Sequence, residues 1–397
     1  MAEQHGKALV PQIRFAGFTD PWEQRKLGEV AHFINGRAYS QNELLSSGKY
    51  PVLRVGNFYT NDSWYYSNLE LEDKNYAYEG DLLYTWSATF GPHIWHGNKV
   101  IYHYHIWKVQ LEAALEKLFA FQLLERDKER ILSDKNGSTM VHITKTGIEN
   151  TSVLMPCSVE EQRRIGAFFD RLDSLITLHQ RKYDKLCVLK KSMLDKMFPK
   201  GGSLYPEIRF AGFTDPWEQR QLGELVTTTI GGGTPSTSNP AYWDGEIPWI
   251  QSSNVLEDTL FDVDIPKAIT QKGLEESAAQ IVPENSIAVV THVGVGKLIY
   301  LPFQYSTSQD FISLCGLKGD ARYTCYALWK RLQEDLHIVQ GSAIKGITKE
   351  DLLEKNLPMP SVEEQAQIGV LFSQLDNLIT LHQRKRLSIR QRSPVWS

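Results

Sequence analysis

Two stretches of the chain carry side chains that could read the edges of DNA bases. Residues 31–156 and 226–360 are rich in amide, guanidinium, hydroxyl and aromatic side chains at positions where turn residues predict loops. Arg, Asn and Gln can pair with base edges in the major groove, and Lys and Arg can also bind phosphates without reading sequence. The candidate DNA-contacting residues are Arg37, Tyr39, Arg54, Asn57, Ser87 and His93 in the first stretch and Thr234, Ser236, Gln251, Ser252, Asn254, Thr291, His292, Lys297 and Lys345 in the second.

Motifs for nucleotide or cofactor chemistry are incomplete in this sequence. Gly294-Val-Gly-Lys297 ends like a phosphate-binding loop, but Thr291 stands where the first glycine of that loop belongs. Gly231-Gly-Gly233 does not continue into a G-x-G-x-x-G pattern. Asn239-Pro-Ala-Tyr242 has Ala where the Asn-Pro-Pro-aromatic motif of amino-methyltransferases has its second proline. The sequence therefore predicts no catalytic residue and no bound cofactor in this chain.

The composition is that of a globular chain. Its 397 residues are 42% hydrophobic and carry a net charge of −4, so DNA binding would require local basic patches. Four scattered cysteines outside any CxxC pair fit a reducing cytoplasm, and no run is long and apolar enough to suggest a membrane contact. The clustered histidines lack the H-E-x-x-H pattern, and we expect no metal site. The expected location is cytoplasmic.

Two blocks of sequence that occur twice must position these stretches. Residues Pro11–Val30 and Pro206–Leu225 are identical at 17 of 20 positions, and we call each a leader block. Residues Val159–Lys182 and Val362–Lys385 are identical at 17 of 24 positions. The chain is thus two tandem units, each with a leader block, a dissimilar middle and a repeated segment. Within the middles, short apolar runs predict strands, and helices are expected near residues 112–132 and 323–336.

The second repeated segment predicts a long amphipathic helix. Ser-x-x-Glu sequences before each copy have the form of a capping box, with caps at Ser158, Glu161, Ser361 and Glu364. Apolar residues then recur at intervals of three and four, and in the first copy the pattern reaches about Phe198. A helix this long needs a partner, and the expected partner is its own repeat. The predicted coiled-coil core consists of Ile165, Phe169, Leu172, Ile176, Ile368, Phe372, Leu375 and Ile379.

The predicted fold class is α+β. Two mixed α/β domains are joined by two long antiparallel coiled-coil helices in a pseudo-two-fold arrangement. The second helix should be at least about two turns shorter, because the apolar pattern stops after Lys385 and Pro394 follows. The expected order is a leader block at 1–30, a domain at 31–156, a helix at 157–200, a linker with the second leader block at 201–225, a domain at 226–360 and an apparently truncated helix at 361–397.

Several short motifs at matching places in the two units carry a resemblance to a known family. They are Trp22–Glu29 with its copy from Trp217, Gly232–Ser236 followed by Tyr242–Trp249, Gly341–Thr348 followed by Pro358–Gln365, and Gly137-Ser138 with Ile143-Thr144 leading to Glu160–Gln162. In this doubled arrangement, nearly the whole chain resembles the specificity (S) subunit of type I restriction–modification enzymes.

The resemblance implies a division of labour. The two middles would be target recognition domains that each read one half of a bipartite site in double-stranded DNA, and the repeated helices would set the spacer. Two methyltransferase (M) subunits would dock on the helices and leader blocks, bring S-adenosylmethionine and methylate adenine. Restriction (R) subunits would join the complex with ATP and Mg²⁺, and this chain would be non-catalytic. A coiled-coil scaffold that binds only proteins and a stand-alone DNA methyltransferase remain the alternative hypotheses.

Overall fold

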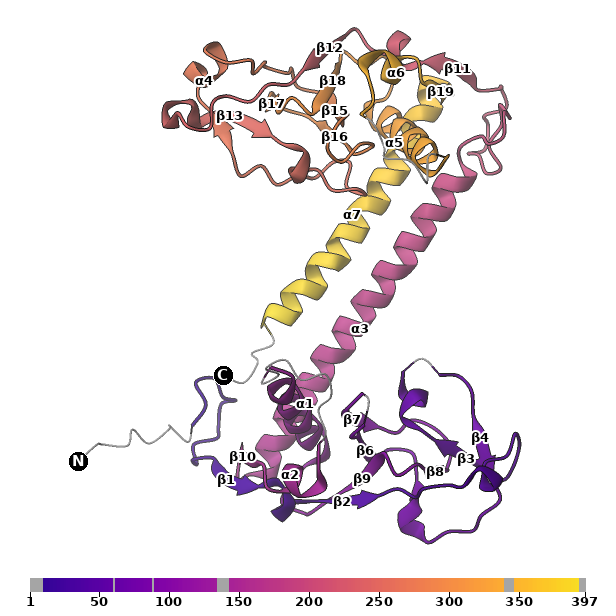
Figure 1. Ribbon diagram of the computed structural model, residues 1–397, viewed down its shortest axis with the longest axis vertical. Helices are drawn as coiled ribbons and strands as arrows, with labels where there is room; N and C mark the ends of the chain where they lie inside the picture. The colour runs from indigo at the N-terminus through magenta and orange to yellow at the C-terminus, as the bar shows by residue number, and fades with distance from the viewer. Residues whose placement is uncertain (1–9, 60, 88, 134–142, 339–345, 393–397) are drawn as a thin grey trace, which may run out of the picture. The chain divides into compact units, whose positions relative to one another are not determined.

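The structure, a computed structural model, describes residues 10–59, 61–87, 89–133, 143–338 and 346–392. Its contacts divide the chain into two compact units, residues Met1–Leu178 with Arg386–Ser397 and residues His179–Lys385. The boundary crosses both long helices, α3 (Val159–Lys196) and α7 (Val362–Arg392) (Figure 1). Within the described residues, no helix is long and apolar enough to cross a membrane.

The first unit contains two four-stranded sheets. The antiparallel sheet has the order β2 (Ala31–Asn35), β9 (Ile106–Leu111), β6 (Leu82–Thr85), β7 (Gly91–Ile94). The mixed sheet has the order β4 (Tyr65–Ser67), β3 (Tyr50–Leu53), β8 (Val100–Tyr102), β5 (Tyr76–Ala77), with β3 and β8 parallel. All four residues of β6 are buried, because this central strand is covered on both faces.

The second unit repeats this strand order, except that its mixed sheet has no counterpart of β5, although its sequence differs. Its antiparallel sheet has the order β12 (Thr228–Gly231), β18 (Phe311–Cys315), β15 (Ser286–Val290), β16 (Leu298–Leu301). Its mixed sheet has the order β14 (Ala268–Ile269), β13 (Trp243–Ile250), β17 (Ser306–Thr307), with β13 and β17 parallel. The internal repeat therefore extends through the dissimilar middles at the level of the fold.

Helices and two short sheets complete both units, and they follow the same order apart from the additional short helix α4 of the second unit. The helices are α1 (Lys117–Ser133) and α2 (Lys145–Glu149) in the first unit and α4 (Gln271–Glu275), α5 (Ala321–Ile338) and α6 (Lys349–Leu353) in the second. The two-stranded sheets pair β1 (Glu23–Lys26) with β10 (Ser152–Met155) and β11 (Glu218–Gln221) with β19 (Asn356–Met359). The helices predicted near 112–132 and 323–336 are confirmed as α1 and α5, and the short sheets join each leader block to the end of its middle.

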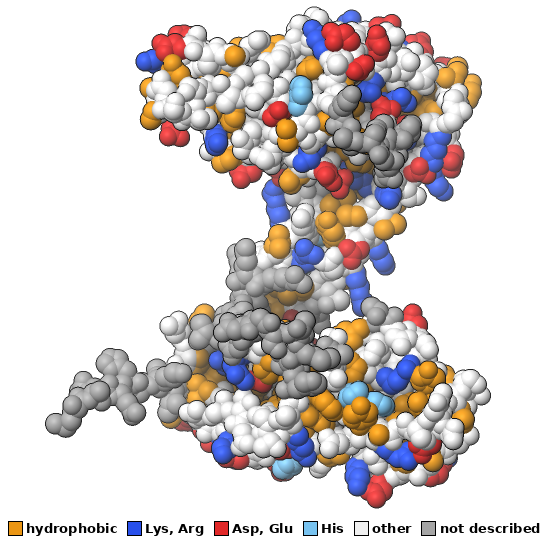
Figure 2. All heavy atoms as spheres, in the orientation of Figure 1, with side chains coloured by type: hydrophobic (Ala, Val, Ile, Leu, Met, Phe, Trp, Pro, Cys, Tyr) orange, Lys and Arg blue, Asp and Glu red, His pale blue; other side chains and the backbone are white. Residues whose placement is uncertain are grey.

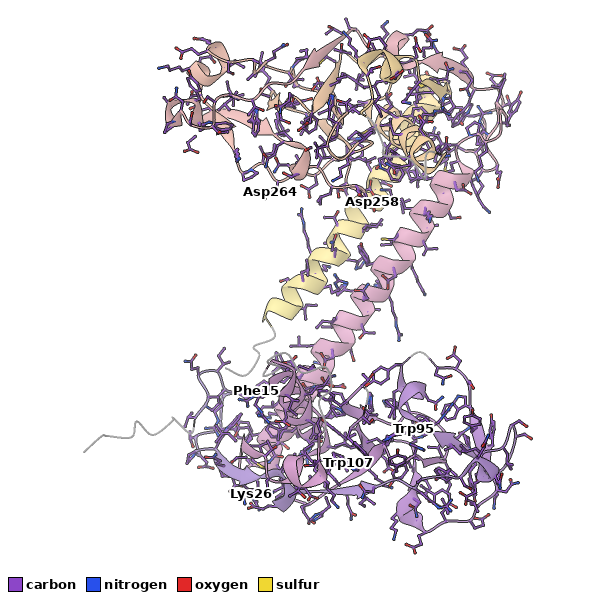
Figure 3. All side chains as sticks on the ribbon, viewed as in Figure 1. Phe15, Lys26, Trp95, Trp107, Asp258 and Asp264 are labelled. Atoms are coloured by element: carbon purple, nitrogen blue, oxygen red, sulfur yellow. The ribbon has the colours of Figure 1, made fainter. Side chains whose placement is uncertain are left out.

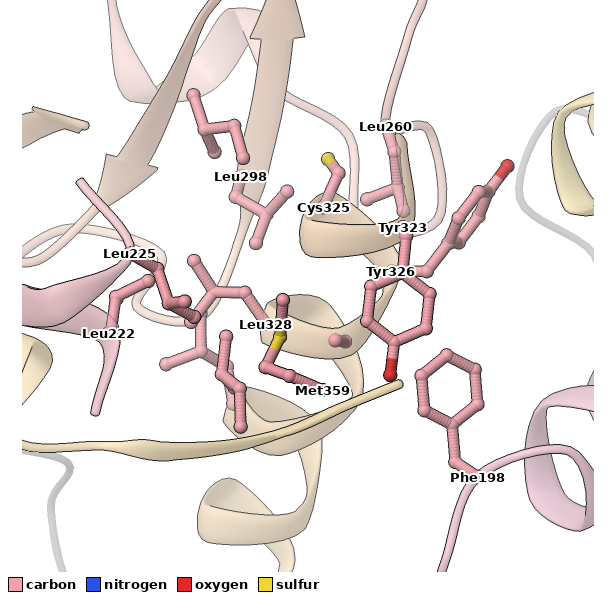
Figure 4. Packing of buried hydrophobic residues seen from close by; sticks show 14 of the residues in the cluster. Phe198, Leu222, Leu225, Leu260, Leu298, Tyr323, Cys325, Tyr326, Leu328 and Met359 are labelled. Carbon is pink, nitrogen blue, oxygen red and sulfur yellow. The ribbon is translucent and has the colours of Figure 1, made fainter. Parts of the chain in front are cut away.

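The largest core lies in the second unit and includes the end of α3. Phe198, just after α3, stacks on Tyr323 of α5 with ring centroids 5.5 Å apart and also contacts Phe372 of α7 at 6.2 Å. Figure 4 shows Phe198 beside Tyr323 and Met359 in this cluster. Burial of each such side chain is worth roughly 1.5–3 kcal/mol, so the end of α3 is an integral part of the second unit.

The predicted coiled-coil core divides between two kinds of packing. Ile165 and Phe169 pack on the core of the first unit, in a cluster that holds no described residue of α7, so the helix–helix prediction was wrong for them. Ile368, Phe372 and Leu375 lie in the core of the second unit beside the end of α3. The remaining three, Leu172, Ile176 and Ile379, are half-buried.

Within the second unit, three contacts relate α3 and α7. Nδ1 atoms of His179 and His382 lie 2.8 Å apart, Lys190 pairs with Asp376 at 2.6 Å, and Phe198 contacts Phe372. The residue number falls along α7 as it rises along α3, which is the order of antiparallel helices. Within the described residues, which end at Arg392, α7 has 31 residues and α3 has 38. The predicted shortening of the second helix stays a prediction.

A glycine in each long helix permits the close approach of α1 in the first unit and of α5 in the second. A Cβ at Gly166 would lie 2.7 Å from the backbone nitrogen of Phe119, and one at Gly369 would lie 3.1 Å from that of Tyr323. We expect Gly166→Ala to destabilise the first unit by about 1–3 kcal/mol, although alanine favours helix by about 1 kcal/mol. Thermal unfolding would measure this, with exposed Ser174→Ala as the control that should be neutral; an equally stable Gly166→Ala variant would contradict the close packing.

Candidate nucleic-acid interface

An ion pair in each unit ties the leader block to the start of the long helix. The Arg14 guanidinium donates to both carboxylate oxygens of Glu161, at 2.6 and 2.7 Å, and Arg209 does the same to Glu364, at 2.7 and 2.8 Å. Both carboxylates are buried, with side chains 1% and 0% exposed. Hydrogen bonding to Glu161 raises the pKa of Arg14, and hydrogen bonding to Glu364 raises that of Arg209.

This pairing corrects the predicted capping boxes. The Ser158 and Ser361 hydroxyls do accept hydrogen bonds from the backbone N–H groups of Glu161 and Glu364, at 3.4 and 3.3 Å. The two carboxylates, however, bind the leader arginines instead of returning to the backbone of the serines, and Trp22 also donates to Glu161 at 3.3 Å. The serine of each predicted box therefore caps the helix, whereas the glutamate binds the leader block, an ion pair that we call the clamp.

The glutamine after each clamp glutamate binds the residue just before a helix, α1 in the first unit and α5 in the second. Gln162 accepts a hydrogen bond from the backbone of Glu116 at 2.9 Å and donates to Pro156 at 2.8 Å. Gln365 makes the equivalent bonds to Asp320 and Pro360, at 3.1 and 2.8 Å. Each repeated Glu-Gln pair thus joins leader block, recognition domain and long helix at one point.

Three loops meet at the same place in both units. In the first, the backbone of His103 donates to Leu53 at 2.9 Å and that of Trp86 donates to His105 at 3.2 Å. In the second, Ser308 donates to Ile250 at 2.8 Å and Thr291 donates to Asp310 at 2.8 Å. Strand pairing makes these bonds equivalent. We call the resulting loop sets the first and second reading surfaces; they comprise residues 54–59, 86–87 and 103–105, and residues 251–254, 291–297 and 308–310.

The two frames match, but their side chains do not. Equivalent positions hold Arg54 and Gln251, Trp86 and Thr291, His103 and Ser308, Tyr104 and Gln309, and His105 and Asp310. Tyr104 is 39% exposed, and its counterpart Gln309 is exposed as well. One backbone frame therefore presents aromatic and imidazole side chains in the first unit and Gln251, Gln309 and Asp310 in the second, where Thr291 and Ser308 are buried.

Aromatic stacking organises the first reading surface around His93. Its ring lies 4.0 Å from that of Phe58, and its Nε2 lies 3.2 Å from the Tyr59 hydroxyl and 3.3 Å from that of Thr85. Trp95 and Trp107, labelled in Figure 3, pack on Phe58 and Trp86 respectively. On the face shown in Figure 2, histidines of this unit lie among hydrophobic side chains. Tyr59 and Tyr104 at this surface are both partly exposed.

Burial lowers the pKa of His93 to about 4, with a further contribution from Lys128. Its folded-state pKa lies below the ordinary 6.5, so the folded state binds fewer protons and loses stability as the pH falls below about 6.5. We expect the melting temperature of the first unit to fall between pH 7 and pH 5, and to fall less in a His93→Phe variant that keeps the stack. Tyr59→Phe, which removes only the hydroxyl contact, should retain the full pH dependence; an identical dependence in His93→Phe would contradict this assignment.

Several predicted DNA-contacting residues of the first unit have structural partners. Arg37 is paired with Glu43 at 2.7 Å and covers the half-buried ring of Tyr39. The Asn57 amide fixes a turn, since its oxygen accepts from the backbone of Arg54 and its nitrogen donates to Asn61 and Ser63. Base contact by Asn57 stays a prediction. Arg54 donates to Ser63 and lies 4.2 Å from the centre of the Tyr65 ring, at the rim of the surface.

In the second unit, too, several predicted DNA-contacting residues have structural partners. Thr291 is fully buried and donates to the carbonyl of Asp310 at 3.0 Å, so the prediction of base contact was wrong for it. The Asn254 oxygen accepts from the backbone of Gln251 at 3.0 Å, which fixes the turn as Asn57 does. Thr234 donates to Gln309 at 2.5 Å and therefore supports a residue of the surface.

The other predicted residues stay predictions. His292 is exposed, and Lys297 is half-buried without an ion pair among the described residues. Their loop borders a hollow of about 420 Å³ that Thr348 and Lys349 also line. Ser87 and Ser252 are half-buried within the surfaces; Ser236 is exposed and contacts Ser238. Lys345 lies outside the described residues.

Reasoning from the sequence missed Tyr104, Gln309 and Asp310. Each follows a buried strand of the mixed sheet and precedes the next strand of the antiparallel sheet. No motif marks them, and only the parallel pairing of β3 with β8 and of β13 with β17 brings them to the other loops. The leader arginines were also missed, although their identical occurrence beside identical Glu-Gln pairs was a usable signal.

Comparison with known proteins places this architecture in one family. The family described as type I restriction modification DNA specificity domain matches residues 19–187 and 214–391. The chain is 24% identical over 392 residues to the type I restriction enzyme MjaVIII specificity subunit of Methanocaldococcus jannaschii, covering 94% of this chain and 90% of that protein. It is 27% identical over 188 residues to the EcoR124I/EcoR124II specificity subunit of Escherichia coli, covering 44% and 45%.

A solved structure shows the same fold. It is the S subunit of a type I restriction-modification system from M. genitalium, which shares 14% sequence identity with this chain and gives a TM-score of 0.63 over 96% of both chains. Both copies of the repeated helix segment, Val159–Lys182 and Val362–Lys385, fall within the family match, which covers most of the chain. This chain therefore belongs to the family of type I restriction–modification specificity subunits.

Proposed function

We propose that the chain reads a bipartite DNA target, with one half contacted by each reading surface. The observation that carries this is the pair of matching backbone frames with different side chains, because such frames can bind equivalent features of a duplex while reading different bases. As a specificity subunit the chain is a non-catalytic component of its enzyme. S-adenosylmethionine, ATP and Mg²⁺ would be bound by partner subunits.

We further propose that α3 and α7 act as an antiparallel coiled coil that relates the two recognition domains by a pseudo-two-fold axis and sets the spacer. The antiparallel contacts within the second unit support this, and so do the hydrogen bonds of Gln162 and Gln365 that fix each helix to its own recognition domain. The long helices and leader blocks, each present twice, would also dock two copies of a methyltransferase subunit.

Sequencing of methylated bases in cells that carry this chain and its methyltransferase subunit tests the proposal. The expected result is one motif with two specified halves around an unspecified spacer. Methylation without such a motif, or a motif with a single continuous half, would contradict it.

A single substitution should separate the two surfaces. Gln309 is exposed, and its amide can pair with a base edge, a contact worth about 1–3 kcal/mol of discrimination. We expect Gln309→Ala to relax the second half of the motif and leave the first half unchanged, as measured by methylation of a library of altered sites. Gln304→Ala, an exposed glutamine outside the surface, is the control; a change in both halves would show that the surfaces are not independent.

A further inference from the structure

The long helices concentrate the positive charge of an otherwise acidic chain. Residues 177–192 and 377–392 contain ten Lys and Arg and a single acidic residue, Asp184, whereas the whole chain carries −4. The rest of the chain is therefore strongly acidic. A basic segment on such a background marks a site for an anionic partner.

Within the second unit, part of this charge surrounds a contact between equivalent residues. His179 and His382 are the same position of the two repeats, and their Nδ1 atoms lie 2.8 Å apart. Lys182 and Lys385, one turn further along each helix, both act on His382 and contribute to lowering its pKa, after burial and His179. Two repeats that touch at equivalent residues do so at the centre of a local two-fold arrangement.

The lysines at this centre have no acidic partner among the described residues. Lys182 and Lys385 are exposed and form no ion pair. The same is true of Arg181 and Lys185 beside them. Arg384 pairs with Asp262 at 2.7 Å, but both side chains are mostly exposed, so the arginine can exchange this partner for another anion. In Figure 2, Lys and Arg side chains project from the exposed helices. We call these five residues the central basic surface.

We propose that the central basic surface binds the phosphates of the unspecified spacer, between the two half-sites. This rests on the proposed function. A duplex bound by two equivalent heads has its own two-fold centre in the spacer, so two symmetric lysines face two symmetric phosphates. Spacer bases need not be read, and contacts from Lys and Arg to phosphate carry no sequence information. The spacer would then contribute affinity as well as distance.

Salt dependence of DNA binding tests the assignment. The full chain with its methyltransferase subunit is titrated with its methylation target across a range of salt concentrations. Loss of two phosphate contacts in Lys182→Gln/Lys385→Gln should reduce the slope of log affinity against log salt by about 2, equally for altered half-sites. Lys26→Gln/Lys196→Gln, exposed lysines without ion pairs outside this surface, should keep the original slope.

Modified DNA locates the contact. A target with uncharged methylphosphonates only in the spacer should bind the unaltered complex with the same reduced slope of log affinity against log salt. The modification should not lower the affinity of the double variant further. Equal binding of modified and normal spacers would overturn the proposal, as would loss of the methyltransferase subunit from the double variant, which would make the surface a protein-docking site. Failure of the unaltered complex to prefer any duplex would instead refute the proposed function.

Discussion

Arg209→Met should destabilise the second unit by about 3 kcal/mol or more, because it leaves the Glu364 carboxylate buried without its partner. Glu364 is 0% exposed, and both its oxygens are bound by Arg209. Methionine can fill much of the volume of the arginine stem, so lost packing alone would cost less. The expected result is a large fall in the midpoint of denaturant unfolding.

An exposed ion pair in the same leader block provides the control. Arg220 pairs with Glu224 at 3.3 Å, with both side chains about half exposed, and such pairs contribute about 0–1 kcal/mol. Arg220→Met should therefore leave the midpoint nearly unchanged. Similar midpoints for the two variants would show that the clamp does not hold the leader block. Arg209→Met combined with Glu364→Leu should recover part of the stability, since it removes the unpaired charge.

The framework was largely predictable because its signals are local and occur twice. An apolar spacing of three and four after a serine was sufficient to begin helices at Val159 and Val362, where α3 and α7 do begin. Such features depend on neighbouring residues, and repetition removes the ambiguity of a single occurrence.

The partners of the long helices were harder to predict. A stripe of apolar residues shows that a face is buried but does not say against what, and Ile165 faces its own domain core where a second helix was expected. Glu161 fits a capping box by sequence, yet an arginine 147 positions away takes its carboxylate. Long-range pairing of this kind leaves no local signal.

The reading surfaces were the least predictable part. Asn57 and Asn254 have the chemistry to pair with a base, but both fix turns, a role that local asparagines often take. Thr291 opens a loop in sequence and is nevertheless buried. The common fold of the two middles was also invisible, because strand order depends on which apolar runs pair and tolerates wide variation in their sequence.

That common fold leads to the prediction with the largest effect on function. The two middles begin and end at equivalent backbone bonds, from Leu27 to Thr151 and from Leu222 to Lys355, each 2.9 Å long. Replacing residues 222–355 with a second copy of residues 27–151 should therefore preserve the sheet of β11 and β19. It should also preserve the hydrogen bond of Gln365, which would be made to the copy of Glu116 in place of Asp320. The chimera should fold with two identical reading surfaces.

The motif of this chimera depends on how the heads are related. If α3 and α7 place them about a two-fold axis, identical heads read the two strands in opposite directions, and the methylated motif becomes a palindrome of the first half-site around the same spacer. A tandem arrangement of the heads would instead give a direct repeat. Sequencing of methylated bases distinguishes the two outcomes in one experiment. The reciprocal chimera, with two copies of residues 222–355, should give the palindrome of the second half-site, and a direct repeat from either chimera would rule out the two-fold arrangement.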